Sequence, residues 1–128
     1  MTSLILCNCR GARKKEIGHL LRDLILRWEI SFAGLSETMV EDLSRSDVDR
    51  LAGRNWDFVH HPSAGRSGGF AVLWQSDVVQ FVPISLSRKC VIGDVTFPDK
   101  RSWRAVFVYA NKDAYVRRQL WSLLEQFA

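Results

Sequence analysis

A strand, a helix and a second strand are indicated within the first 35 residues of the chain. Residues 4–9 (LILCNC) and 30–35 (ISFAGL) are short apolar runs typical of buried strands. Between them, apolar residues recur at helical spacing and form one stripe: Ile17, Leu20, Leu21, Leu24, Ile25 and Trp28. This order predicts a βαβ unit, in which the two strands run parallel and the connection is right-handed. The chain therefore begins as an α/β fold.

The rest of the chain is richer in strand signals. Residues 42–53 predict a short helix that ends at a glycine, and residues 56–61 predict a short strand. Four β-rich segments separated by turn residues then predict a largely antiparallel meander, at 68–74, 78–86, 88–97 and 103–110. Residues 114–128 predict a closing amphipathic helix with four inward apolar residues: Leu120, Trp121, Leu124 and Phe127. No repeat or long linker divides the sequence, so we expect a single domain over residues 1–128.

Composition narrows the class of protein. With 128 residues, 47% of them apolar, the chain can bury one core, which argues against a disordered protein. No apolar run approaches the roughly 18 residues of a membrane span, and no signal peptide is recognisable, so we expect an intracellular protein without a membrane partner. The three cysteines lack metal-ligand spacing and are expected to be reduced. The net charge of +4 favours polyanionic partners.

Polar residues end both strands of the βαβ unit. Alternation along a strand places Leu4, Leu6 and Asn8 on one face, with Asn8 at the carboxyl end, where open α/β sheets bind ligands. Glu37 follows the second strand at the same end. Neighbouring strands lie about 5 Å apart, so the amide and carboxylate oxygens can hold one Mg²⁺ that keeps several waters. The alternative is structural: Asn8 can cap the turn at Gly11, and Glu37 can cap the second helix.

Two later features, a tyrosine at a strand end and a glycine-rich loop, are further candidates for the site. In WRAVFVY, alternation places Tyr109 at the end of its strand, although amphipathic packing with a solvated hydroxyl is the alternative role for this residue. The loop SAGRSGG precedes a strand and lacks the G-x-G-x-x-G spacing, which does not favour a nucleotide-binding loop. It can lie near DNA with Arg66 reaching a phosphate, or it can be a plain turn.

Five short motifs occur in the order seen in the endonuclease/exonuclease/phosphatase superfamily. They are NCRG at 8–11, LSET at 35–38, GRSGGFAVLW at 65–74, VYAN at 108–111 and RQLW at 118–121. The chain resembles most closely the endonuclease domain of plant LINE-type (non-LTR) retrotransposon reverse transcriptases, which are relatives of apurinic/apyrimidinic endonucleases. The resemblance implies a four-layer αββα sandwich of two packed sheets, cleavage of DNA that depends on Mg²⁺ (or Mn²⁺), and a nuclear location.

The same resemblance implies roles for particular residues. Asn8 and Glu37 match the metal-site positions, and Tyr109 matches a tyrosine near the scissile phosphate, so these three are the implied catalytic residues. The implied nucleic-acid contacts are Arg66, Ser67 and Asn111. In the last motif, Arg118 supports the site and Trp121 packs.

The sequence departs from the superfamily pattern in its later motifs. G-D-x-N and S-D-H, which supply the water-activating and phosphate-binding groups in relatives, are absent, and Cys7 replaces a usual tryptophan. We therefore expect a truncated domain and an incomplete sandwich, inactive alone. Its expected partners are DNA and the remaining half of the domain or a downstream reverse-transcriptase segment. The alternative is a degenerate remnant that binds nucleic acid or protein. A lipid or inositol phosphatase is a weaker third choice.

Two expectations follow from the missing motifs. Three histidines are candidates to replace the absent base, although each is more often a surface or packing residue: His19, His60 and His61. A half-domain without its opposing sheet would also leave apolar rows such as those of Val72 and Phe107 uncovered, which predicts poor solubility or self-association.

Overall fold

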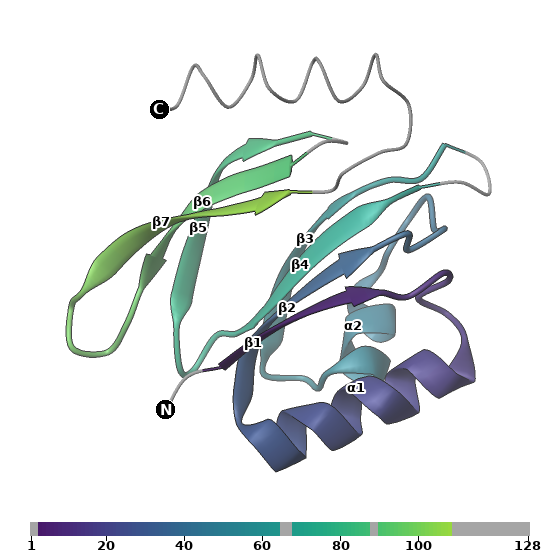
Figure 1. Cartoon of the computed structure of the whole chain (residues 1–128), viewed down its shortest axis with the longest axis horizontal. Coiled ribbons are helices and arrows are strands. Elements are labelled where there is room, and N and C mark those ends of the chain that lie inside the picture. Colours follow the sequence, from purple (N-terminus) through teal and green to yellow (C-terminus); the bar gives the residue numbers. More distant parts are fainter. Residues whose placement is uncertain (1–2, 65–67, 88–89, 109–128) are drawn as a thin grey trace.

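The computed structural model describes residues 3–64, 68–87 and 90–108, which form two helices and seven strands (Figure 1). In chain order these are β1 (Ser3–Asn8), α1 (Lys15–Trp28), β2 (Ile30–Ser36), α2 (Arg45–Leu51), β3 (Trp56–His61), β4 (Phe70–Gln75), β5 (Gln80–Leu86), β6 (Cys90–Thr96) and β7 (Ser102–Val108). The helix expected at residues 114–128 lies outside the described residues.

The first sheet has the strand order β1-β2-β4-β3. β1 and β2 are parallel neighbours, and α1 connects them, which confirms the predicted βαβ unit. Both helices cover one face of this sheet (Figure 1). From α1, Leu21 is buried and Ile17, Leu24 and Ile25 pack against the same core, but Leu20 and Trp28 are exposed, so the inward stripe is narrower than expected.

The second sheet is the antiparallel meander β5-β6-β7. The expected meander had four strands, and its first member, β4, instead pairs with β2 and β3 in the first sheet. The reason is that β4 is apolar on both faces: Ala71 and Leu73 enter the core beneath the helices, while Val72 and Trp74 enter the core between the sheets. Only an internal strand of a covered sheet buries both faces.

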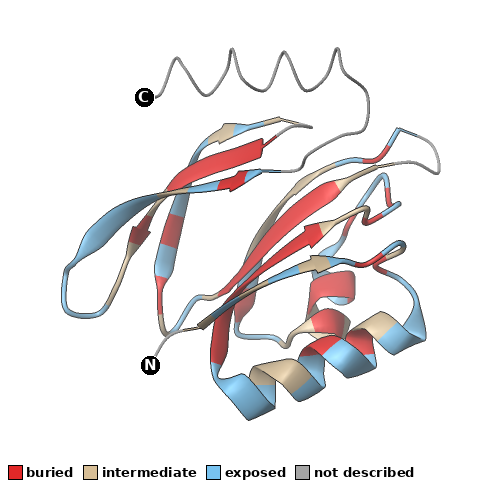
Figure 2. Cartoon of the chain, viewed as in Figure 1, coloured by how far each residue is buried: buried red, intermediate tan, exposed pale blue. Residues whose placement is uncertain are grey.

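The two sheets pack face to face through an aromatic core. Phe81 of β5 lies at its centre, with ring centroids 6.1 Å from Phe32, 5.1 Å from Trp74 and 6.0 Å from Phe107. Gly93 of β6 pairs with Pro83, two residues along β5 from Phe81, and a Cβ at Gly93 would collide with the Phe81 ring. Figure 2 shows how the buried residues concentrate in the middle of both sheets.

The expectation that Val72 and Phe107 lack cover is wrong. Val72 is 0% and Phe107 6% exposed, because the opposing sheet is present and packs on both. Exposed apolar residues lie instead on the edge strands, among them Leu4 and Leu6 of β1 and Trp103 of β7, and on the outer face of α1, where Leu26 is 83% exposed. No helix among the described residues is long and apolar enough to cross a membrane.

Candidate functional site

The candidate site is built where β1 and β2 end side by side. Asn8 pairs with Ser36 in the parallel register, and the pairing continues past the strands. The Cys9 N–H donates to the Ser36 carbonyl at 3.0 Å, and the Gly11 N–H donates to the Glu37 carbonyl at 2.9 Å. Asn8 and Glu37 therefore occupy neighbouring strand ends, as the sequence predicted.

Asn8 lies on the face of the first sheet that is turned toward the second sheet. Alternation places it with Leu6, whose side chain passes over Gly34, and a Cβ at Gly34 would also lie 3.6 Å from the Phe107 ring of β7. The Asn8 side chain is exposed. An amide oxygen at this position is thus available to a ligand between the ends of the two sheets.

Glu37 is held in a left-handed conformation, with φ 52°. Such a backbone is uncommon for a residue other than glycine, asparagine or aspartate and persists only where the surroundings fix it. Here the surroundings are two loops: the Ala12 N–H donates to the Thr38 carbonyl at 2.8 Å, and the Met39 N–H donates to the Gly68 carbonyl at 2.9 Å. Hydrogen bonds from both sides therefore fix the backbone that carries the Glu37 carboxylate.

The two glycines of the SGG motif complete this frame. Gly68 and Gly69 have φ values of 79° and 91°, and the Gly69 carbonyl accepts the Thr38 N–H at 3.2 Å. A Cβ at Gly69 would collide with the Thr38 hydroxyl oxygen. Gly68 and Gly69 therefore support the residues that follow Glu37, and their hydrogen bonds do not require a bound phosphate.

The structural alternative for Glu37 is excluded, because another residue caps the second helix. The Ser44 hydroxyl accepts the Asp47 N–H at 3.2 Å, and the Asp47 carboxylate accepts the Ser44 N–H at 3.0 Å, which is a capping box. Asp47 also binds Arg13, with distances of 3.3 and 3.1 Å. Burial opposes ionisation of Asp47, but the hydrogen bonds from Arg13 and Ser44 outweigh it and lower its pKa to about 2.

A basic side chain faces the Glu37 carboxylate. Arg10 Nε lies 3.9 Å from Glu37 Oε2, and the two side chains are 79% and 33% exposed. At this distance and exposure the ion pair is weak, so a divalent cation can compete with Arg10 for the carboxylate. Among the described residues, no group of three or more histidine, cysteine, aspartate or glutamate side chains could hold a metal. A cation at this end would therefore depend on one carboxylate, one amide oxygen and waters, which is a ligand set that suits Mg²⁺.

Thr38 is a buried polar residue of the site that the sequence reasoning did not single out, although it ends the LSET motif. It is 0% exposed, and its hydroxyl lies 3.0 Å from Nε2 of His60 on β3. Burial, with a contribution from the neighbouring His61, lowers the pKa of His60 to about 4. His60 is therefore neutral at pH 7 and engaged by Thr38, while His19 is exposed on α1.

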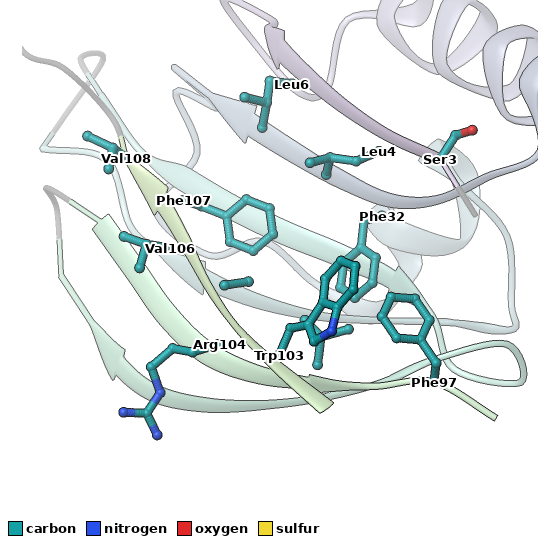
Figure 3. Close-up of a pocket in the computed structure, with 12 residues that line it drawn as sticks. Ser3, Leu4, Leu6, Phe32, Phe97, Trp103, Arg104, Val106, Phe107 and Val108 are labelled. Carbon is teal, nitrogen blue, oxygen red and sulfur yellow. The ribbon is translucent and has the colours of Figure 1, made fainter. Parts of the chain in front are cut away.

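β7 ends on the same side of the molecule as β1. Figure 3 shows Leu6 and Val108 toward one end of the groove between these strands, and Ser3 and Phe97 toward the other. The chain thus leaves β7 at the end where Asn8 lies. Six residues expected at the site lie outside the described residues: Arg66, Ser67, Tyr109, Asn111, Arg118 and Trp121.

Comparisons with known proteins identify the fold. The sequence matches no protein-family model and no curated protein. Among solved structures, the AP endonuclease LMAP from Leishmania major superposes with a TM-score of 0.63 at 18% identity, over 91% of this chain and 42% of that one. A humanized D. rerio TDP2 superposes with a TM-score of 0.62 at 14% identity, over 96% of this chain and 57% of that one. An AP endonuclease from Archaeoglobus fulgidus superposes with a TM-score of 0.60 at 15% identity, over 99% of this chain and 49% of that one.

The chain shares the fold of these proteins. The expected α/β sandwich of the endonuclease/exonuclease/phosphatase type is therefore confirmed as a fold. The chain spans about half the length of the solved structures it resembles, from 42% to 57% for these three.

We predict that the folded chain loses stability as the pH falls from about 7 to about 4. Unfolded His60 takes up a proton near its ordinary pKa of about 6.5, whereas folded His60 does so only near 4, so protons favour the unfolded state in this window. Urea unfolding at stepped pH measures the effect. His60→Gln keeps a hydrogen-bonding partner for Thr38 and should flatten the curve between pH 7 and 4. His19→Gln is the control and should leave the curve unchanged; equal slopes in all three proteins would contradict this account.

Proposed function

We propose that this chain forms the metal-binding part of a DNA phosphodiesterase, in which Asn8 and Glu37 hold Mg²⁺ (or Mn²⁺). The observation that carries the proposal is the register of β1 and β2, which brings these two residues to neighbouring strand ends. Two of the structures that share the fold are AP endonucleases by name, which supports DNA as the substrate. The net charge of +4 suits the same partner.

The chemistry fits these residue types. A bound divalent cation would stabilise negative charge that develops on the phosphate during phosphodiester hydrolysis. Asn8 and Glu37 would orient that cation, and the hydrogen-bonded frame around Glu37 would keep the carboxylate in place. We propose Tyr109, the next residue in sequence after β7, as the group near the scissile phosphate. The proposed DNA contacts are Arg66, Ser67 and Asn111, and the proposed supporting residues are Arg118 and Trp121.

Within this class, the five motifs favour a LINE-type retrotransposon endonuclease of plant type, acting in the nucleus. We propose that residues 1–128 bind DNA but do not cleave it, because hydrolysis also needs a base that activates water. His60 is a poor substitute, since Thr38 occupies its Nε2 atom. The second candidate function, a non-catalytic binding module, is favoured by one observation: the exposed Arg10 side chain lies near the Glu37 carboxylate, with Nε 3.9 Å from Oε2, and would compete with a cation for it.

We predict that Glu37→Gln weakens Mg²⁺ binding by tenfold or more, about 1.4 kcal/mol. The amide keeps the shape of the side chain but removes the negative charge that attracts the cation. Isothermal titration calorimetry measures this. Glu29→Gln is the matched control, because Glu29 follows α1 with the same φ of 52° at the opposite end of β2. Equal Mg²⁺ affinity in the wild type and Glu37→Gln would contradict the metal site and favour the binding module.

We predict weak, sequence-independent binding of duplex DNA that falls steeply with salt. Each phosphate neutralised by a lysine or arginine contributes roughly −0.9 to the slope of log K against log salt concentration. Fluorescence anisotropy of labelled duplexes measures the slope. In the same solutions with Mg²⁺, abasic or supercoiled DNA should stay intact. Nicking by residues 1–128 that Glu37→Gln abolishes would overturn the prediction of inactivity, and His60 and His61 would then be the bases to test.

A further inference from the structure

Glu37 belongs to a three-residue stretch of unusual backbone at the end of β2. Glu37 and Met39 both have left-handed backbone, with φ 52° and 56°, on either side of Thr38. This conformation is unfavourable for a residue with a Cβ and persists only where neighbouring contacts fix it. The direction in which the Glu37 side chain leaves the backbone therefore depends on the contacts that hold this stretch.

Backbone hydrogen bonds hold Thr38 from two loops. The Thr38 N–H donates to the Gly69 carbonyl at 3.2 Å, and the Thr38 carbonyl accepts the Ala12 N–H at 2.8 Å. Ala12 lies between β1 and α1, and Gly69 immediately precedes β4. Loops open more readily than paired strands, so a contact with a strand would give the stretch a firmer support.

The Thr38 side chain makes such a contact with a strand. Its hydroxyl is buried and lies 3.0 Å from Nε2 of His60, which belongs to β3 and pairs with Ala71 of β4. In the first sheet β4 lies between β2 and β3 (Figure 1), so the contact reaches across the end of β4. Burial lowers the pKa of His60 to about 4, and the hydroxyl therefore meets a neutral imidazole at pH 7. The Glu37 stretch is thus tied to a third strand of the sheet.

Gly69 leaves the space that this contact needs. A Cβ at Gly69 would collide with the Thr38 hydroxyl oxygen, so a larger residue there would displace the hydroxyl from His60. A buried hydroxyl that loses its partner is costly, which favours a single position for the Thr38 side chain. The backbone at Thr38 is therefore specified by its side chain as well as by its own hydrogen bonds.

We propose that Thr38 and His60 are positioning residues for Glu37, and that their hydrogen bond fixes the direction of its carboxylate. The consequence for metal binding rests on the proposed function, in which that carboxylate holds the cation. Neither Thr38 nor His60 would touch the cation, and both act through the backbone of Glu37. Residues that orient a metal ligand in this way typically change metal affinity by about 10–100-fold when they are replaced.

Thr38→Val tests the proposal, because it keeps the shape of the side chain and removes the hydroxyl. We expect Mg²⁺ to bind this variant about tenfold more weakly than the wild type in isothermal titration calorimetry. Thr38→Ser restores the hydroxyl and should regain most of the lost affinity. Thr96→Val is the matched control: the Thr96 hydroxyl donates to the Ser102 hydroxyl at 3.4 Å in the second sheet, and its loss should leave Mg²⁺ affinity unchanged.

A double-mutant cycle tests whether the two residues act through one contact. His60→Leu removes the same hydrogen bond from the other side and should weaken Mg²⁺ binding by a similar factor. The double variant Thr38→Val/His60→Leu should then bind no more weakly than either single variant, since the contact is already lost. Losses that multiply in the double variant would overturn the shared role.

Hydrogen exchange without metal provides a readout that does not depend on the proposed function. In Thr38→Val, the amides of Ala12, Thr38 and Met39 should lose protection, while those of β2 and β4 stay protected and show that the chain is folded. Thr38→Ser and Thr96→Val should keep the wild-type pattern.

The two measurements separate the proposal from the proposed function. Unchanged Mg²⁺ affinity in Thr38→Val, with weaker binding in Glu37→Gln, would overturn the positioning role and leave the metal site in place. Equal losses in Thr38→Val and Thr38→Ser would also overturn it. A wild type that does not bind Mg²⁺ would contradict the proposed function; a loss of protection confined to Thr38→Val would then still support the positioning role, and unchanged protection would overturn it.

Discussion

The parallel pairing of β1 with β2 is the interaction on which the rest of this structure depends. It fixes Asn8 beside Ser36 and then continues as hydrogen bonds from Cys9, Gly11 and Ala12 to residues 36–38. Because this continuation holds Glu37 in a left-handed conformation, the carboxylate leaves the strand at a defined point. The glycine pair at 68–69 supports the same segment from the other side. The candidate site is thus a consequence of strand pairing and of two loops that close on one residue.

The core holds the two sheets together behind this strand end. β4 supplies apolar residues to both faces of the first sheet, and Phe81 joins the two sheets above Gly93. Burial of a phenylalanine of this kind contributes roughly 1.5–3 kcal/mol, and close aromatic pairs add about 0.5–1.5 kcal/mol each. These contacts join the two sheets. The edge strands β1 and β7 leave apolar side chains exposed to water, among them Leu4, Leu6 and Trp103.

Local patterns were sufficient for most elements and for the pairing of Asn8 with the end of β2. Alternation and β-rich composition predicted strands, helical spacing predicted α1, and a terminal glycine predicted α2, because each of these signals lies in consecutive residues. The place of β4 was not predictable in this way, because a run that is apolar on both faces fits a meander and an internal strand equally well. Thr38 and its contact with His60 depend on the pairing of β3 with β4, which is a property of tertiary structure. Motif order indicated Glu37 and the SGG turn, whereas their physical connection through the Thr38 and Met39 amides required coordinates.

The central claim is that the paired ends of β1 and β2 hold a divalent cation through Asn8 and Glu37. Paramagnetic broadening by Mn²⁺ in the ¹H–¹⁵N spectrum of the labelled chain tests it most directly, because broadening reports distance from the bound ion residue by residue. The account predicts that substoichiometric Mn²⁺ selectively broadens the amides of residues 8–11, 36–39 and 68–69. Broadening centred instead on Asp42 and Asp49, with residues 8–11 and 36–39 unaffected, would contradict it.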